Sequence, residues 1–162
     1  MKYTEPTLEH IEGFAVSGID VRTINSDEFN QDTAKLPALW GNFFSKAIAE
    51  KIANRLPDSS IYGVYSAYES DATSFYTVTA GVAVENELKS SEFSTVNIKD
   101  GYYLVFSGKG MRPNVIVDTW KNIWTYFATN SKYTRSYLSD FERYNGSEDI
   151  AIYIGIQKPA EL

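Results

Sequence analysis

Apolar residues recur at helical spacing in two stretches of the chain. From Leu36 to Ile52 they lie three or four positions apart, and the Leu56-Pro57 pair ends the pattern after Arg55. We therefore predict an amphipathic helix over residues 36–55. The same spacing predicts a second helix, whose apolar stripe is Ile116, Trp120, Ile123, Trp124 and Phe127.

Strand patterns fill most of the remaining chain. Residues 8–21 alternate between two faces and contain two glycines, which predicts a long strand with a bulge or kink. The Asp100-Gly101 pair is a turn signal between two further short strands. The other strands are predicted over residues 61–69, 74–84, 93–98, 102–108, 137–144 and 150–156.

The same order of elements occurs twice. Residues 36–84 and 115–156 each contain an apolar-faced helix, a strand that ends in an aromatic residue followed by Glu, and a strand with few charges. A duplicated half-domain leaves a groove along its pseudo-twofold axis, and aromatic grooves bind small ligands. We predict an α+β fold of duplicated strand-helix-hairpin modules. They would form a mixed antiparallel sheet with two main helices on one face and a ligand groove on the other.

Strand alternation assigns side chains to the two faces. The four isoleucines of residues 150–156 share one face, which must be core, so Tyr153 points to the opposite side. The same argument places Tyr76 on the core face of its strand. Two acids remain for the groove: Glu69 shares a side with Tyr65, and Glu142 occupies the corresponding position in the second copy.

Charge and composition exclude several kinds of function. With 15 Lys and Arg against 21 Asp and Glu, the net charge of −6 works against binding a phosphate backbone. The chain has no cysteine, and His10 has no second ligand at metal-binding spacing. No apolar run approaches the roughly 20 residues that a membrane-spanning helix needs. We expect a single cytoplasmic domain over residues 1–162, without cofactor, metal, direct nucleic-acid contact, membrane attachment or a DNA-binding domain.

Several motifs, each weak alone, run through the chain. They are Tyr62-Gly63-Val64-Tyr65, Tyr68-Glu69-Ser70-Asp71, Tyr76-Thr77-Val78 with Gly81-Val82, Tyr103-Leu104-Val105-Phe106, Thr119-Trp120-Lys121-Asn122-Ile123-Trp124, Asp140-Phe141-Glu142-Arg143-Tyr144 and Ile152-Tyr153-Ile154-Gly155-Ile156. Over about residues 3–157 they resemble the GyrI-like effector-binding domain of AraC-type transcription regulators. The chain is also similar to stand-alone integron-cassette members of that family, which are associated with cationic drug binding.

The resemblance implies two strand-helix-hairpin modules and a central groove. Hydrophobic, often cationic compounds would bind there against a buried glutamate and aromatic walls. Several relatives read Glu-Ile-Tyr-Ile in the last strand, and Ala151 stands where that Glu would be. The acidic role therefore falls to Glu142 or Glu69. The other expected ligand-binding residues are Tyr153, Trp124, Tyr65, Tyr103 and Phe106.

Each of these residues also has a purely structural interpretation. Glu142 can pair with a nearby Arg or Lys at the surface, and Glu69 can end a strand in water. Core packing is the default for tryptophans on a helix stripe, so we expect Trp40 and Trp120 in the core and Trp124 as the exception.

These features favour a non-enzymatic domain that binds a hydrophobic aromatic cation. A carboxylate among rings attracts a cation because little water screens it, and each ring face adds about 0.5–2 kcal/mol. We expect a monomer or weak homodimer, and a separate protein partner for any DNA contact. Two alternatives stay open. One is a hydrolase of reactive small molecules, with a Glu as nucleophile or base, and the other is a module that inhibits a protein target by surface contact.

Overall fold

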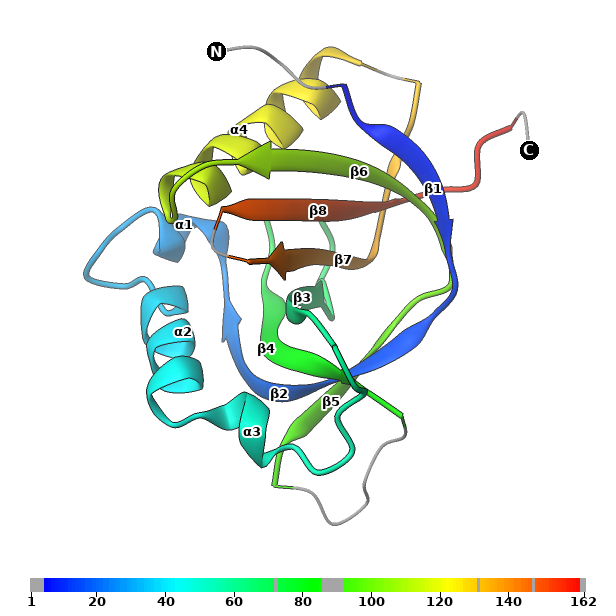
Figure 1. Cartoon of the computed structure of the whole chain (residues 1–162). Coiled ribbons are helices and arrows are strands. Elements are labelled where there is room, and N and C mark those ends of the chain that lie inside the picture. The colour runs from blue at the N-terminus through cyan, green and yellow to red at the C-terminus, as the bar shows by residue number, and fades with distance from the viewer. Residues whose placement is uncertain (1–4, 72, 86–91, 131, 147, 161–162) are drawn as a thin grey trace.

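The computed structural model describes residues 5–71, 73–85, 92–130, 132–146 and 148–160 (Figure 1). The strands are β1 (Thr7–Ile11), β2 (Phe14–Thr23), β3 (Ile61–Ser66), β4 (Tyr76–Val84), β5 (Ser94–Ile98), β6 (Gly101–Lys109), β7 (Arg135–Asn145) and β8 (Asp149–Ile156). The helices are α1 (Asn25–Glu28), α2 (Leu36–Ser45), α3 (Ile48–Lys51) and α4 (Asn114–Thr129).

The strands form one 8-stranded sheet in the order β1-β6-β8-β7-β3-β4-β2-β5, and the neighbouring strands run antiparallel. This order is symmetric about the β3–β7 pair. One half holds β2, α1 to α3 and the β3–β4 hairpin, and the other holds β6, α4 and the β7–β8 hairpin. The predicted α+β fold of duplicated strand-helix-hairpin modules is confirmed.

Two long bent segments curl the sheet. β1 and β2 form one extended segment broken at Glu12-Gly13, as predicted from the glycines. They pair with β6 and β5, which are joined at Asp100-Gly101. The curl brings together strands that are distant in the sheet order. The backbone N–H of Lys99, just after β5, donates to Oγ of Ser139 on β7 at 3.1 Å.

The face of the sheet that carries no helix is filled by its own side chains. Its buried cluster draws on strands from across the sheet and includes Val16, Ile98, Tyr103, Phe141 and Tyr153. The rings of Phe141 and Tyr153 stack with their centroids 4.3 Å apart. A face on which the ligand groove was expected is therefore a second hydrophobic core, because the curled sheet packs against itself.

The helices cover the other face, one group on each half of the sheet (Figure 1). α2 and α3 pack Leu39, Phe43 and Ile48 against β4, and α4 packs Val115 and Ile123 against β6 and β8. The four isoleucines of β8 are buried here, as predicted. Within the part of the chain that the structure describes, no helix is both long enough and apolar enough to cross a membrane.

The helix predicted over residues 36–55 is two helices. α2 ends at Ser45, Ala47 adopts a left-handed backbone conformation with φ 49°, and α3 begins at Ile48. The break turns Ile48 and Ile52 into the core. Apolar spacing cannot reveal such a break, because the apolar residues on both sides of it point to the same core.

The close approach of β2 and β4 requires glycine. Gly18 lies opposite Gly81, and a Cβ on Gly18 would lie 1.8 Å from the carbonyl oxygen of Ala80. We expect Gly18→Ala to lower the free energy of unfolding by about 3 kcal/mol, because the strands must separate. Urea unfolding measures this change.

Gly41 provides the matched control for that substitution. It lies inside α2, and a Cβ there would meet nothing within 4 Å. We expect Gly41→Ala to raise the free energy of unfolding by about 0.5–1 kcal/mol, because alanine is the better helix former. Similar effects of the two substitutions would contradict the close strand packing.

Candidate functional site

A cavity of about 930 Å³ lies between α2 and α4 on the helix-covered face of the sheet. Trp40 and Phe44 of α2 form one wall, and Trp120 and Trp124 of α4 form the other. The floor comes from β3, β4 and β7, where the two modules meet. The cavity therefore lies at the junction of the modules, but on the face opposite to the one predicted.

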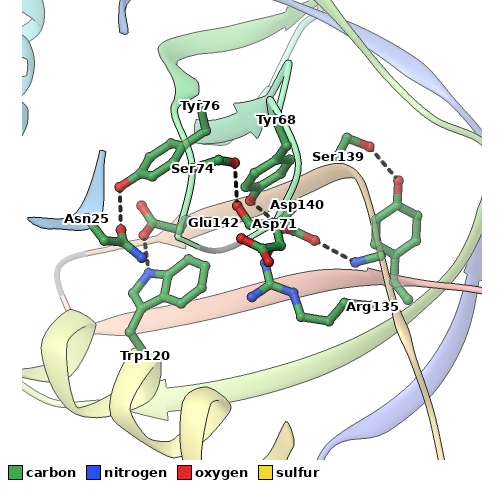
Figure 2. A network of polar contacts seen from close by, with 12 residues as sticks. Asn25, Tyr68, Asp71, Ser74, Tyr76, Trp120, Arg135, Ser139, Asp140 and Glu142 are labelled. Carbon is green, nitrogen blue, oxygen red and sulfur yellow. Dashed lines mark hydrogen bonds and ion pairs between the residues drawn. The ribbon is translucent and has the colours of Figure 1, made fainter. Parts of the chain in front are cut away.

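Glu142 lies on the cavity floor, opposite Gly63 in the β3–β7 register. It is 2% exposed, and three neutral groups donate hydrogen bonds to its carboxylate. The Tyr65 hydroxyl donates to Oε2 at 3.0 Å, the Trp120 indole N–H donates to Oε2 at 2.6 Å, and the Tyr144 hydroxyl donates to Oε1. Figure 2 shows the Trp120 nitrogen directed at this carboxylate. Among the described residues, no Lys, Arg or His forms an ion pair with Glu142.

Burial controls the ionisation of this group. Desolvation raises the pKa of Glu142 above its ordinary value, and the hydrogen bonds from Trp120, Tyr144 and Tyr65 oppose the rise. Burial, followed by the Glu142 charge, raises the pKa of Tyr65 and that of Tyr144 well above the usual tyrosine value. Both hydroxyls therefore keep their protons and remain donors. The carboxylate is oriented by neutral groups and has no cationic partner among the residues that the structure describes.

Gly63 makes room for this arrangement. A Cβ on Gly63 would lie 2.9 Å from Oε1 of Glu142 and 2.9 Å from Cζ2 of Trp40. Because glycine stands there, the Trp40 ring reaches down to the sheet beside the carboxylate.

Aromatic rings form a continuous path along the cavity. The ring centroids are 6.1 Å apart for Trp124 and Trp120, 5.1 Å for Trp120 and Tyr65, 5.6 Å for Tyr65 and Tyr76, and 5.8 Å for Tyr76 and Tyr68. All five side chains line the cavity. A ligand lying on this path contacts rings along its length.

A second acid near the cavity already has a cationic partner. Asp140 accepts a hydrogen bond from Nη2 of Arg135 at 2.7 Å in a buried ion pair. The Tyr68 hydroxyl also donates to it at 2.5 Å (Figure 2). The backbone N–H of Gly155 donates to its other oxygen at 2.8 Å. This network fixes the irregular part of β7 between Arg135 and Asp140, and it neutralises the Arg135 charge at the cavity wall.

The structure brings three of the predicted site residues to the cavity, namely Glu142, Tyr65 and Trp124. Glu69, the alternative acid, is exposed and lies outside the cavity lining. β3 ends at Ser66, before the predicted end at residue 69, so the alternation that places Glu69 beside Tyr65 does not extend that far.

Tyr153, Tyr103 and Phe106 lie elsewhere. Tyr153 and Tyr103 belong to the core on the face without helices. Phe106 packs beneath α4, with its ring centroid 5.5 Å from that of Tyr126. Alternation correctly places Tyr153 on the face opposite the isoleucines. That face is not open, however, because it packs into the second hydrophobic core of the curled sheet.

Sequence reasoning missed three important cavity residues: Trp40, Trp120 and Tyr144. The two tryptophans were expected in the core, and both do pack against it, but their rings also line the cavity. Trp120 lies one helical turn before Trp124, so a pocket position for Trp124 also indicates one for Trp120. Tyr144 lies two residues from Glu142 on one strand and therefore on the same face.

An aromatic cavity with a buried, uncompensated acid, set between duplicated modules, is typical of a small-molecule-binding domain. The chain belongs to the Cass2 family of integron-associated effector binding proteins, whose model matches residues 7–156. The resemblance to effector-binding domains is thereby confirmed.

Three similar proteins extend this assignment. An integron cassette protein from the mobile metagenome of Vibrio cholerae is 35% identical, with a TM-score of 0.83 over 96% of this chain and 97% of that chain. YobU of Bacillus subtilis (strain 168), described as a transcriptional regulator, is 26% identical over 159 residues, which cover 93% of this chain and 97% of YobU. The structure of SAV2435 bound to tetraphenylphosphonium shares the fold, with 14% identity and a TM-score of 0.75 over 95% of this chain and 94% of that chain. The family is thus related to the ligand-binding domains of transcription regulators.

We expect Glu142 to make the protein less stable as the pH rises. Its pKa is raised in the folded state, so the folded chain holds the proton more tightly than the unfolded chain does. Stability should therefore fall as the pH rises from the ordinary value of 4.5 through the raised one. Glu142→Gln keeps the shape and removes this loss. The variant should melt at a higher temperature than wild type near neutral pH. This difference in melting temperature should disappear near the ordinary glutamate pKa.

Thermal unfolding over this pH range measures the difference. Glu12→Gln is the matched control, because Glu12 is an exposed acid outside the cavity lining. We expect no comparable pH-dependent difference for it. A wild type that melts above Glu142→Gln near neutral pH would contradict the burial argument.

Proposed function

We propose that the cavity binds a hydrophobic aromatic cation as its effector, with Glu142 as the counter-charge. The observation that carries this proposal is a carboxylate that is 2% exposed, held by three neutral donors, and without a cationic partner among the described residues. An unpaired charge is costly to bury, and a bound cation would offset that cost. The site would therefore select for positive charge.

The cavity walls favour an aromatic ligand. Trp120, Trp124 and Tyr65 offer ring surfaces near Glu142, and ring faces attract cations as well as apolar groups. The volume of about 930 Å³ lies within the range of small-molecule sites, roughly 300–1,000 Å³. Contacts of this kind have little directional preference, so the site would tolerate ligands of different outline.

The relatives support the same class of ligand. SAV2435, which shares the fold, was determined with tetraphenylphosphonium bound, and this ligand is an aromatic cation. The family is described by effector binding. Both agree with a site whose selectivity comes from charge and apolar surface.

Hydrolysis is less well supported by this geometry. The three hydrogen bonds to Glu142 spread its charge and weaken it as a nucleophile. Asp140, the neighbouring buried acid on β7, is held by Arg135.

We infer that the described residues do not bind DNA themselves, so any effect on transcription would depend on a DNA-binding partner outside them, on this chain or on another. α2 contains no Lys or Arg, and Lys121 is the only basic residue of α4. Neither helix has the basic face that contact with a phosphate backbone needs, and the net charge of −6 opposes it. The protein would then act by binding its effector and contacting that partner.

Tetraphenylphosphonium and tetraphenylborate test the proposal, because they share a shape and carry opposite charges. We expect wild type to bind the phosphonium and to show no measurable affinity for the borate. Glu142→Gln should weaken phosphonium binding about 10- to 100-fold, because it removes the charge and keeps the shape. Isothermal titration calorimetry measures both affinities.

Glu12→Gln is again the control, since it makes the same change in net charge at an exposed position. It should alter the phosphonium affinity by less than about twofold, because a distant surface charge is screened by salt. Unchanged phosphonium binding by Glu142→Gln, or tight borate binding by wild type, would refute the electrostatic proposal.

A further inference from the structure

Glu28 is a second carboxylate of the cavity lining, and the proposal above does not use it. Its Oε2 accepts hydrogen bonds from the Thr23 hydroxyl at 2.5 Å and from the backbone N–H of Lys35 at 2.9 Å. Its Oε1 accepts one from the backbone N–H of Leu36 at 3.2 Å. Glu28 therefore repeats the pattern of Glu142: three neutral donors, two of them on one oxygen. In the described parts of the chain, no Lys, Arg or His forms an ion pair with it.

Tyr76 connects the surroundings of the two acids. Its hydroxyl donates to Oδ1 of Asn25 at 2.6 Å (Figure 2). Asn25 lies on α1 together with Glu28. Its ring lies 5.6 Å from the ring of Tyr65, whose hydroxyl donates to Glu142. Burial first, and then the charges of Glu28 and Glu142, raise the pKa of Tyr76. Both carboxylates thus act on a single ring of the cavity.

The cationic side chains of the lining leave both acids without a counter-charge. Arg135 is paired with Asp140 at 2.7 Å. Arg112 donates to a backbone carbonyl oxygen of the β7–β8 turn at 2.6 Å and lies over the ring of Tyr144. Lys121 is exposed on α4. Arg135 is thus neutralised by an acid, Arg112 is held by a backbone carbonyl oxygen, and Lys121 faces solvent. None of the three forms an ion pair with Glu28 or Glu142.

Building on the proposed function, we propose that the cavity takes dications. Its ligands would carry two positive charges on one aromatic framework, one charge facing Glu142 and the other facing Glu28. The framework would lie on the rings of Tyr65 and Tyr76 between them. A monocation would use Glu142 alone and leave Glu28 without a partner.

Ethidium and propidium test this inference, because they share a phenanthridinium ring system and propidium adds a quaternary ammonium on a propyl chain. We expect wild type to bind propidium about tenfold more tightly than ethidium, because a second charge pair forms in a partly dry site. Glu28→Gln should weaken propidium about tenfold and ethidium by no more than about twofold. Calorimetry at fixed ionic strength measures all four affinities.

Two further variants separate this inference from the proposed function. Glu142→Gln should weaken both dyes, and Glu12→Gln should weaken neither. If Glu142→Gln affects neither dye, the proposed function fails, and the dication inference fails with it. If Glu142→Gln weakens both dyes but Glu28→Gln leaves the preference for propidium intact, only the dication inference is overturned, and Glu28 serves to hold the start of α2.

The wild-type measurement alone also tests the inference. Glu28 accepts backbone hydrogen bonds at the start of α2, so the melting temperature of Glu28→Gln must be measured beside its affinities. Gln keeps one oxygen acceptor for these donors. If the variant is too unstable to titrate, the ratio of the wild-type affinities for propidium and ethidium still tests the inference. Equal affinity of wild type for the two dyes overturns it.

Discussion

The pairing of Gly63 with Glu142 across β3 and β7 is the contact on which the rest of the site depends. Side chains directly opposite each other on antiparallel strands lie about 4.5–5.5 Å apart at Cβ, so a larger residue at position 63 would occupy the space of the carboxylate. The donors then converge from β3, β7 and α4. Because β3 belongs to one module and β7 and α4 to the other, neither module contains the site alone.

The curl of the sheet explains why the site lies among the helices. A flat sheet with helices on one side would leave its other side open, but here the bent β1–β2 and β5–β6 segments draw that side together around Phe141 and Tyr153. The space that remains is the gap where α2 and α4 each cover only their own half of the sheet. Duplication therefore creates the cavity, and curling decides its face.

Much of this architecture could be predicted from the sequence. The isoleucines of β8 and the stripe on α4 are regular enough to fix element type and one buried face, and the duplicated order indicated two modules. Glu142 could be named as a candidate but not separated from Glu69, because that choice depends on where β3 ends. The positions of Tyr153 and Tyr103 could not be predicted, since alternation sorts side chains into two faces without showing that both are buried. Trp40 and Trp120 follow a core-like spacing, which does not distinguish packing against a sheet from lining a cavity.

The three tryptophans of the chain, Trp40, Trp120 and Trp124, all line the cavity. Trp120 also donates its indole N–H to the Glu142 carboxylate. Indole absorption and emission depend on nearby charge and on contact with water. The intrinsic tryptophan fluorescence of this protein therefore originates entirely at the cavity, and occupancy of the site can be followed optically without attaching a label.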